Sequence, residues 1–406
     1  MANKTVCVVG LGYIGLPTAA LLATNGYQVV GVDLNTHAVD TINKGQIHIV
    51  EPDLDAYVRS SVAAGKLKAY TKPEQADIYM ICVPTPFHEG GDIPQPNIDY
   101  VLAATRSIAH LVTPGDLVIL ESTSPVGTTR RMGEVLQEAG VDLSTVHLAY
   151  CPERVLPGKI MIELVENDRI VGGLTPEATK LASNFYRTFV RGEVLETDAS
   201  TAEMCKLTEN SYRDVNIAFA NELSLLCAKV GINVWRLIEL ANRHPRVNIL
   251  HPGAGVGGHC IAVDPWFIVA RDPENARLIR TAREVNNYKM EWVINQIKIA
   301  VADASAKTGG KPKVACLGLA FKPDIDDLRE SPALHIALRL QANGYDIVAV
   351  EPNIGDHNGL SLVDLEEALA TADVLAVLVK HKQFLAPLVK TELYEAGALD
   401  FCGAIK

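Results

Sequence analysis

The 406-residue sequence lacks any stretch approaching the roughly 18 consecutive apolar residues of a membrane-spanning helix, so we expect no membrane span. Its first residues, MANKTVCVVG, do not have the charged, apolar and small-residue regions of a signal peptide. Its eight cysteines are widely spaced and form no CxxC pair. This spacing favours buried free thiols in a cytoplasmic protein over disulfides or a zinc site.

The sequence also has no excess of basic residues. Asp and Glu number 48 against 37 Lys and Arg, which gives a net charge of -11 and disfavours a bulk nucleic-acid binder. An anionic ligand must therefore be held by a local site. The hydrophobic share of 48% and charged share of 21% are those of a globular protein. At about 150 residues per domain, the length predicts two or three domains.

Strand and helix patterns alternate in the first part of the chain. Apolar, β-branched residues predict strands over 5–9 and 28–32, separated by a helix over 16–24. The alternation continues with a strand over 77–83, a helix over 97–111 and a strand over 117–120. Such alternation predicts a parallel sheet covered by helices on both faces.

The middle of the chain differs. Helical spacing of apolar residues predicts long helices over about 200–230 and 275–306, and the β/α alternation resumes at Lys313. We therefore predict an α/β protein with two Rossmann-like doubly wound domains joined by a central domain of long helices. The expected boundaries are 1–198, 199–306 and 307–406.

The two outer regions resemble each other. VCVVGLG, Asn25-Gly26-Tyr27 and QVVGVD near the start correspond to VACLGLA, Asn343-Gly344-Tyr345 and DIVAVE near the end. The second copy lacks counterparts of Gly12 and Gly15 and carries an insertion with Lys322 and Arg329. We interpret it as a second Rossmann-like unit whose phosphate loop binds a different ligand. The alternative is the general likeness of any two such units.

A GxGxxG motif lies between the first predicted strand and helix. Gly10 suits the tight turn, Gly12 lets a pyrophosphate approach the backbone, and Gly15 lets helix pack on strand. Asp33 ends the next strand, where its carboxylate suits a ribose 2'-hydroxyl and repels a 2'-phosphate. The motif therefore predicts NAD as the cofactor rather than NADP.

Two further loops follow strands of the same domain. They are VPTP, which contains Thr85, and ESTSP, which contains Thr123. Loops at the carboxyl ends of parallel strands line the ligand crevice. Both threonines are candidates for hydrogen bonds to cofactor or substrate, with simple turn roles as the alternative.

Three polar residues share one face of the first long helix. Lys206, Asn210 and Arg213 are spaced i, i+4 and i+7. Facing a cleft, they would bind and polarise an anionic, oxygen-rich substrate; the alternative is a solvated helix face.

The segment PGAGVGGHCIAVD, from Pro252 to Asp264, combines four glycines with a cysteine. Glycines let a backbone approach a ligand closely. If a helix follows Cys260, its N-terminus favours the thiolate, and a nucleophilic cysteine beside NAD suggests aldehyde oxidation through a thioester. The alternatives are an inert thiol, or a metal site formed by His259, Cys260 and Asp264, which lacks further ligands at usual spacing.

The sequence resembles the UDP-glucose/GDP-mannose dehydrogenase family, whose members are NAD-dependent four-electron nucleotide-sugar dehydrogenases. The resemblance covers nearly the whole chain. It rests on motifs in the family order: GLGYIGLP, VPTP, ESTSPVGTT, CPERVLPG, AEMCKLTENSYRD, NRHPRVNI, PGAGVGGHC and FKPDIDDLRESP. CPERVLPG, NRHPRVNI and GGHCIAVDPWF resemble the branch that oxidises UDP-N-acetyl-D-mannosamine to its uronate for bacterial surface polysaccharides.

The resemblance implies a catalytic set and a mechanism. Cys260 captures the sugar aldehyde as a thiohemiacetal, a second oxidation gives a thioester, and water releases the carboxylate. Lys206 handles protons and stabilises the oxyanion beside Asn210. Asp264 and Glu153 match carboxylates that manage water and protons, and either could be the base.

The resemblance also implies binding residues, a homodimer and no metal. Arg246 is expected to reach the neighbouring subunit's site. The NAD contacts implied are Gly10, Gly12, Tyr13, Ile14, Gly15, Asp33, Thr85, Thr123 and Arg329. The UDP-sugar contacts implied are Arg154, Val155, Lys206, Asn210, Arg213, His244, Arg246, Gly257, Phe321 and Lys322.

The chain departs from the family pattern at two points. Val263 stands where many members have a lysine, and no basic residue of the expected kind lies around Asp400 to Gly403. Uridine contacts at that edge are therefore in doubt. UDP-N-acetylglucosamine and UDP-glucose remain competing substrates, and a two-electron hydroxyacid-type dehydrogenase and a nucleotide-sensing protein remain competing functions.

Overall fold

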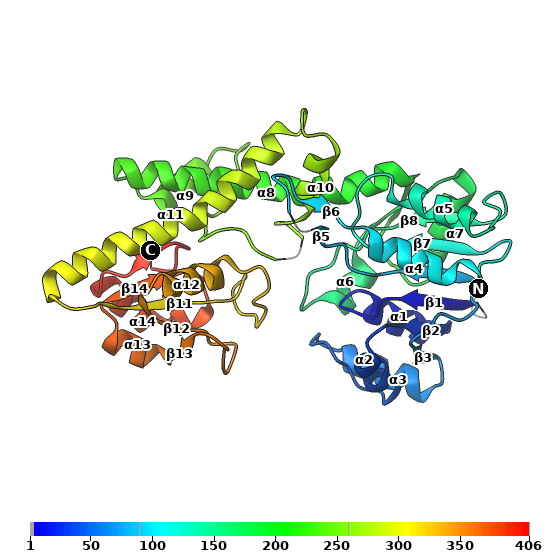
Figure 1. Ribbon diagram of the computed structural model, residues 1–406, viewed down its shortest axis with the longest axis horizontal. Helices are drawn as coiled ribbons and strands as arrows, with labels where there is room; N and C mark the ends of the chain where they lie inside the picture. The colour runs from blue at the N-terminus through cyan, green and yellow to red at the C-terminus, as the bar shows by residue number, and fades with distance from the viewer. Residues whose placement is uncertain (1–3, 89, 259, 406) are drawn as a thin grey trace. The chain divides into compact units, whose positions relative to one another are not determined.

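The computed structural model describes residues 4–88, 90–258 and 260–405. It divides the chain into two compact units: the first ends at Glu209 and the second begins at Asn210. In Figure 1 the first unit runs from blue to green and the second from green to red.

The first unit is built on an eight-stranded sheet with the strand order β10-β9-β8-β7-β4-β1-β2-β3. All neighbouring strands are parallel except β8 and β9. The strands are β1 (Thr5–Val9), β2 (Gln28–Val32), β3 (Leu67–Tyr70), β4 (Ile78–Ile81), β7 (Leu117–Leu120), β8 (His147–Tyr150), β9 (Arg169–Gly173) and β10 (Val194–Asp198). The predicted parallel α/β sheet is confirmed.

Helices cover both faces of this sheet (Figure 1). One apolar core joins it to α1 (Gly15–Thr24), α2 (Thr36–Asn43), α3 (Leu54–Ala63), α6 (Ile160–Glu166) and α7 (Pro176–Tyr186). The other joins it to α4 (Asp99–Ala109), α5 (Thr128–Glu138) and the first residues of α8 (Ala199–Val230). A short antiparallel pair, β5 (Phe87–His88) and β6 (Gln95–Pro96), lies in the loop between β4 and α4.

The second unit contains a smaller, wholly parallel sheet of order β13-β12-β11-β14-β15. Its strands are β11 (Lys313–Leu317), β12 (Asp346–Val350), β13 (Ser361–Leu362), β14 (Val374–Val377) and β15 (Leu399–Asp400). One face packs against α11 (Arg277–Thr308) and α12 (Pro332–Ala342). The other packs against α13 (Leu365–Thr371), the 3-10 helix η1 (Lys382–Leu385) and α14 (Pro387–Glu395).

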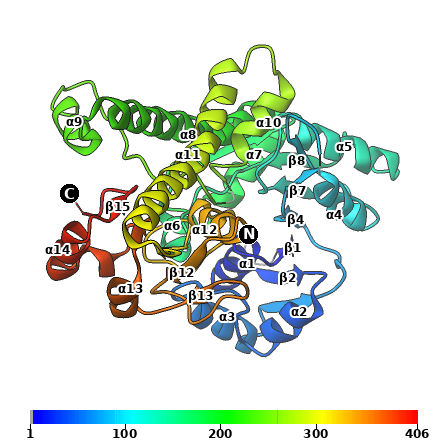
Figure 2. The same cartoon turned by 60° about the vertical axis from the view of Figure 1, so that its left-hand side comes forward.

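Two long helices mark the middle of the chain, as the apolar spacing predicts. Helix α8 supplies residues to both units. Helix α11 ends at Thr308 and is capped by Gly309, whose φ of 71° suits a helix C-terminus. Within the second unit, α11 runs beside α8, while α9 (Val234–Ala241) follows the end of α8 and α10 (Asp264–Arg271) packs on α11 (Figures 1 and 2). The three-domain boundaries stay a prediction.

Two expected absences can be compared with the structure. No described helix is both long and apolar enough to cross a membrane. All eight cysteines lie among the described residues, and each is a free thiol.

Candidate active site

The glycine-rich turn of the first unit joins β1 to α1. Gly10 has a φ of 93° and donates its N–H to Val32 O at 2.8 Å. A Cβ at Gly15 would lie 1.8 Å from Gly10 O, so only glycine fits there, whereas a Cβ at Gly12 would meet no atom within 4 Å. The open space at Gly12 and the N-terminal N–H groups of α1 together fit the pyrophosphate of a dinucleotide.

Asp33 lies directly after β2. Its Oδ2 accepts the Leu11 N–H at 2.9 Å and its Oδ1 accepts the Asn35 N–H at 2.8 Å. A carboxylate oxygen can accept more than one hydrogen bond, so these contacts orient Asp33 and leave it able to accept a ribose hydroxyl. Tyr13 is exposed and Ile14 half-buried beside this turn. The residues of this loop therefore fit NAD.

The loops after β4 and β7 are tied together. Thr85 Oγ1 donates to Thr123 O at 2.6 Å, and Ser122 Oγ donates to Val83 O at 2.6 Å. The Thr85 hydroxyl proton is therefore engaged between the two loops, which is the turn role weighed above. Its oxygen keeps the capacity to accept a bond from a ligand.

Glu153 follows β8 and is almost fully buried. Its Oε2 accepts Arg169 Nη1 at 2.5 Å, and its Oε1 accepts the Arg154 N–H at 2.7 Å. Lys206 Nζ donates to the main-chain oxygen of Glu153 at 2.7 Å. Two of the predicted catalytic residues, Lys206 and Glu153, are thus in direct contact in the first unit.

The Arg154 side chain points elsewhere. Its guanidinium forms a two-point pair with Glu209, with Nη2–Oε1 at 2.7 Å and Nε–Oε2 at 3.1 Å. Nη1 also donates to Asp168 O at 3.1 Å. Val155 packs against the apolar core. A UDP-sugar that uses Arg154 must therefore share it with Glu209.

In the second unit, Asn210 and Asp264 meet. Asn210 Nδ2 donates to Asp264 Oδ2 at 2.6 Å, and both side chains are buried. Asp264 is the first residue of α10. The amide donor orients the buried carboxylate and partly compensates for the hydration that the carboxylate loses.

Cys260 is the one exposed cysteine of the eight. Its carbonyl oxygen accepts the N–H groups of Val263 at 3.0 Å and Asp264 at 2.8 Å, so it begins the turn that leads into α10. The expected helix after Cys260 is therefore present. Burial lowers the pKa of Lys322 and the positive charge of Arg213 lowers it further, while Cys260 opposes this. Lys322 thus interacts electrostatically with Arg213 and with Cys260 within the second unit.

Three of the four glycines before Cys260 pack closely against other parts of the protein. A Cβ at Gly257 would lie 2.3 Å from Glu330 O, and one at Gly258, whose φ is 85°, would lie 2.9 Å from the Phe321 ring. A Cβ at Gly255 would clash with Pro332 at 2.8 Å. Packing against protein is therefore enough to require glycine at these three positions, and the approach of a ligand there stays a prediction.

The likeness between the two Rossmann-like regions is structural. Gly318 has a φ of 92° and donates to Val350 O at 2.8 Å, as Gly10 does to Val32. Glu351, the counterpart of Asp33, accepts the N–H groups of Leu319 at 2.7 Å and Ala320 at 2.9 Å. His381 Nε2 lies 3.0 Å from Glu351, so this carboxylate is covered by protein.

The remaining predicted binding residues of the second unit are exposed. His244 and Arg246 lie after α9, where the Arg246 N–H donates to His244 Nδ1 at 3.3 Å. Arg329 pairs with Asp327 at 2.7 Å. The partner-subunit role of Arg246 and the NAD contact of Arg329 stay predictions.

Three domain models describe this chain. The NAD-binding, central and UDP-binding domains of the UDP-glucose/GDP-mannose dehydrogenase family match residues 4–190, 200–288 and 315–404. The chain belongs to this family. It is an NAD-dependent UDP-sugar dehydrogenase. Its NAD-binding domain contains the Gly10–Gly15 turn, and its UDP-binding domain lies in the second unit.

Relatives of this dehydrogenase include proteins of different named sugar specificity. The UDP-N-acetyl-D-mannosamine dehydrogenase of Escherichia coli K12 is 60% identical, with 95% of both chains covered. The NDP-N-acetyl-D-galactosaminuronic acid dehydrogenase of Ralstonia nicotianae is 55% identical, with 94% of this chain and 92% of the relative covered. The UDP-D-ManNAc dehydrogenase structure from Pyrococcus horikoshii has a TM-score of 0.88 at 39% identity, covering 99% of this chain and 96% of that one.

The metal alternative depends in part on a residue that the structure does not describe. Among the described residues, no three His, Cys, Asp or Glu side chains are grouped as metal ligands. His259, one of the three residues considered for such a site, lies outside the described residues.

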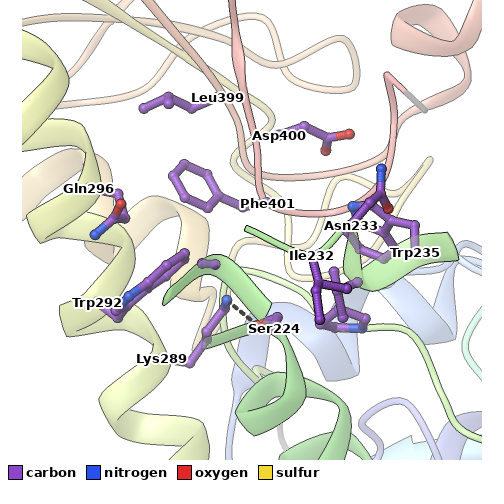
Figure 3. A pocket seen from close by; sticks show the side chains of 13 residues that line it. Ser224, Ile232, Asn233, Trp235, Lys289, Trp292, Gln296, Leu399, Asp400 and Phe401 are labelled. Atoms are coloured by element: carbon purple, nitrogen blue, oxygen red, sulfur yellow. Dashed lines mark hydrogen bonds between the residues drawn. The ribbon is translucent and has the colours of Figure 1, made fainter. Parts of the chain in front are cut away.

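A pocket of about 300 Å³ in the second unit contains none of the predicted site residues. Figure 3 shows Lys289 and Ser224, joined by a 2.6 Å hydrogen bond, on one side and Asp400 and Phe401 on the other. Lys289 Nζ also lies 4.1 Å from the centre of the Trp292 ring. The position of Lys289 in the sequence pattern of α11 does not indicate that this lysine is buried.

Sequence reasoning also missed a buried polar cluster behind Glu153. Arg169, Glu121 and Tyr186 are fully or almost fully buried. Glu121 stands in the ESTSP motif, in which Thr123 is the predicted site residue. A charged residue directly after an apolar strand was the available signal.

Proposed function

We propose that this enzyme oxidises UDP-N-acetyl-D-mannosamine to UDP-N-acetyl-D-mannosaminuronate in two oxidations at the same carbon. Each oxidation removes a hydride and a proton, so two NAD are consumed and four electrons leave the sugar. NAD, when bound, accepts the hydride. Such a product would serve the synthesis of bacterial surface polysaccharide.

The exposure of Cys260 carries the proposal. Its thiolate adds to the sugar aldehyde to form a thiohemiacetal, whose oxidation gives a thioester; water then breaks the carbon–sulfur bond and releases the carboxylate and the thiol. Cys260 begins the turn that leads into α10, and the positive end of that helix would favour the thiolate. Lys322 would supply further positive charge near Cys260.

Four other residues support this chemistry. Lys206, held by the Glu153 carbonyl, would stabilise the alkoxide and oxyanion of the reacting carbon. The Asn210 amide, fixed by Asp264, would donate to the same oxygen. Asp264 and Glu153 are the two candidate bases for activating water, and Glu153 is already an acceptor of three donors counting its main-chain oxygen.

The identity of the sugar is a proposal drawn from several relatives. The curated relatives at 57–60% identity over 95–98% of this chain bear the UDP-N-acetyl-D-mannosamine name. The galactosaminuronic acid relative lies at 55%, so overall identity alone separates the substrates weakly. UDP-N-acetylglucosamine and UDP-glucose therefore belong in the test.

The test is the ratio of NADH formed to sugar consumed, with UDP-N-acetylmannosamine, UDP-N-acetylglucosamine and UDP-glucose in parallel. We expect about two NADH per sugar with the mannosamine derivative preferred. Cys260→Ala should abolish acid formation, whereas Cys205→Ala, on α8, should keep it. A ratio of one, or normal acid production by Cys260→Ala, contradicts the thioester route.

We also propose that two copies of the chain form the active dimer. Large apolar side chains at i, i+7 and i+14 of α8, Tyr212, Phe219 and Leu226, are 69%, 54% and 55% exposed. This stripe would be buried by a second copy. Arg246, on an exposed loop, would then serve the partner's site.

Mixed dimers test the sharing of Arg246. Arg246→Ala and Cys260→Ala are each expected to be inactive alone. Co-expressed, they should recover about a quarter of wild-type turnover, because half of the dimers would be mixed and each would contain one intact site. No recovery in dimers shown to be mixed would place Arg246 and Cys260 of the same chain in one site.

A further inference from the structure

Three neighbouring strands of the second sheet end at one edge, where a loop, a carboxylate and an imidazole follow them. Strand β11 lies between β12 and β14. The loop that follows β11 carries Lys322, Glu351 directly follows β12, and His381 lies after β14. Ligands of parallel α/β sheets bind at the carboxyl ends of the strands. Residues at this edge can therefore bind the ligand or hold the loop that binds it.

His381 is buried, and both of its ring nitrogens have partners. It is 1% exposed, its Nδ1 accepts the Asp324 N–H at 2.9 Å, and its Nε2 lies 3.0 Å from Glu351 Oε2. A main-chain N–H can only donate, so Nδ1 is the unprotonated nitrogen, and Nε2 carries the proton that it donates to the carboxylate. The imidazole therefore links the end of β12 to the main chain of the loop after β11.

Asp324 has a main-chain conformation that depends on its contacts. Its φ of 62° lies in the left-handed region, which residues other than glycine rarely adopt. Such a conformation costs free energy and persists where neighbouring groups fix it. His381 binds the Asp324 N–H, and the Lys382 N–H donates to Asp324 Oδ1 at 2.9 Å. The segment after β14 thus holds the loop after β11 at this residue.

Lys322 lies two residues before Asp324 on the same loop. It is half-buried, and the Phe321 N–H donates to Asp327 O at 3.1 Å, which closes the loop around Lys322. Burial and the positive charge of Arg213 lower the pKa of Lys322. A bound diphosphate would offset both effects, because its negative charge pairs with the ammonium. The Lys322 ammonium is in place for this only while the loop keeps its shape.

The glycine turn of the second unit has lost part of its capacity to bind phosphate. In the first unit, Asp33 accepts the Leu11 N–H at 2.9 Å. In the second unit, Glu351 accepts the corresponding N–H of Leu319 at 2.7 Å and, in addition, the Ala320 N–H at 2.9 Å. An N–H that is bound to a carboxylate is not free for a phosphate oxygen. A diphosphate must therefore be held by the lysine further along the loop.

We propose that His381 is a positioning residue for the binding of the UDP-sugar. Its Nδ1, oriented by the bond to Glu351, fixes the main chain at Asp324 and thereby places the Lys322 ammonium against the diphosphate. The inference rests on the proposed function, in which a UDP-sugar binds to this enzyme. His381 itself contacts neither the ligand nor the reacting carbon, because protein groups engage both ring nitrogens. Its loss should therefore weaken the binding of UDP and leave the oxidation step unchanged.

Glutamine and asparagine each keep one half of the contacts of the imidazole. The amide of His381→Gln reaches the place of Nε2 and can donate to Glu351, but it leaves the Asp324 N–H without its acceptor. The amide oxygen of His381→Asn takes the place of Nδ1 and keeps that acceptor. Calorimetric titration with UDP should therefore give about tenfold weaker binding for His381→Gln and a change of under about threefold for His381→Asn. His335→Gln, exposed on α12, is the control.

Asp324 provides a second pair of variants outside the core, because its side chain is 36% exposed. Asp324→Val should weaken UDP binding by about tenfold, since a β-branched residue disfavours a positive φ, whereas Asp324→Asn tolerates it and keeps the Oδ1 acceptor. Equal UDP affinities of His381→Gln and His381→Asn, or an unchanged affinity in Asp324→Val, would overturn the proposal. NAD affinity should stay within about twofold of wild type in all four variants. A parallel loss of NAD affinity would indicate a general loss of structure and would also overturn it.

UDP titration separates this inference from the proposed function, since it requires no oxidation. With the sugar substrate, His381→Gln should raise KM by about tenfold while kcat stays within about twofold, because binding is lost equally in the ground state and the transition state. Unchanged UDP affinity in His381→Gln, with uronate formed by the wild type, would refute the inference alone. Loss of UDP affinity in that variant, with no uronate formed from any of the three sugars, would refute the proposed function and support the inference.

Discussion

Arg283 Nη1 donates to Asp214 Oδ1 at 2.7 Å, which joins α11 to α8 inside the second unit. Both side chains are buried, and Asn286 Nδ2 donates to the same oxygen at 2.8 Å. Burial raises the pKa of Asp214, and this effect exceeds the lowering by Arg283. The pair thus aligns the two helices at a cost in desolvation.

Removal of one partner should therefore be severe. Asp214→Ala leaves the Arg283 charge buried without its anion, and we expect a loss of about 3–5 kcal/mol in the free energy of unfolding. Arg280→Ala, which breaks an exposed i,i+4 pair with Glu284, should cost under about 1 kcal/mol. Urea denaturation measures both, and similar losses would contradict the difference in burial.

Gly12 and Gly15 should respond differently to alanine. Gly12→Ala adds a Cβ that meets no protein atom within 4 Å, so we expect a near-normal melting temperature with at least about tenfold weaker NAD binding. Gly15→Ala drives a Cβ into Gly10 O and should destabilise the fold itself. Thermal melting and NAD titration of both variants provide the comparison; unchanged NAD affinity in Gly12→Ala would refute the phosphate role.

Lys206→Ala should reduce the turnover number of the enzyme. Its ammonium contacts the Glu153 carbonyl and is expected to stabilise charge that develops on the substrate oxygen. We expect kcat to fall by about 10²-fold or more while the NAD dissociation constant stays within about threefold. Lys159→Ala, at the exposed N-terminus of α6, is the control. A collapse of NAD affinity in Lys206→Ala would remove Lys206 from the sugar side of the reaction.

The burial of Lys289 should lower the free energy of unfolding at neutral and acidic pH. Burial lowers its pKa to about 7, so the unfolded chain binds a proton more strongly than the folded protein does. Stability therefore increases as the pH rises from about 7 toward the ordinary lysine value of about 10.4. Lys289→Met should stabilise the protein at pH 6 by roughly 1–4 kcal/mol, whereas Lys307→Met, exposed on the same helix, should not. Equal melting temperatures of wild type and Lys289→Met at pH 6 would contradict this.

Glu351 should have the opposite pH dependence. Hydrogen bonds from His381 and from the Leu319 and Ala320 N–H groups outweigh burial and hold its pKa at about 2. Its contribution is complete above the unfolded pKa of about 4.3 and is lost as the pH falls toward 2. Glu351→Gln should cost about 2 kcal/mol at pH 7 and reduce the acid dependence of unfolding, with exposed Glu366→Gln as control. An unchanged acid dependence in Glu351→Gln would show that another group carries it.

Much of the fold follows from local sequence patterns. The predicted strands over 5–9, 28–32 and 117–120 have the same bounds in the structure, and the long helices differ from prediction by at most two residues at each end. These elements depend on side-chain periodicity and on glycines at turns, which are properties of neighbouring residues. The correspondence between Gly10 and Gly318 also follows from a local pattern, because each glycine directly follows an apolar strand.

The sequence by itself determined the NAD-binding turn, the alternating architecture and the family, and it predicted a set of reactive residues. Tertiary structure alone decided how those residues are partnered and charged. It buries Glu121 beside Glu153 and Lys289 beside Trp292, turns Arg154 toward Glu209, and assigns the glycines before Cys260 to packing against Phe321 and Glu330. The reason is that hydration and electrostatic partners depend on residues brought together from distant parts of the chain, and proton affinity follows from both.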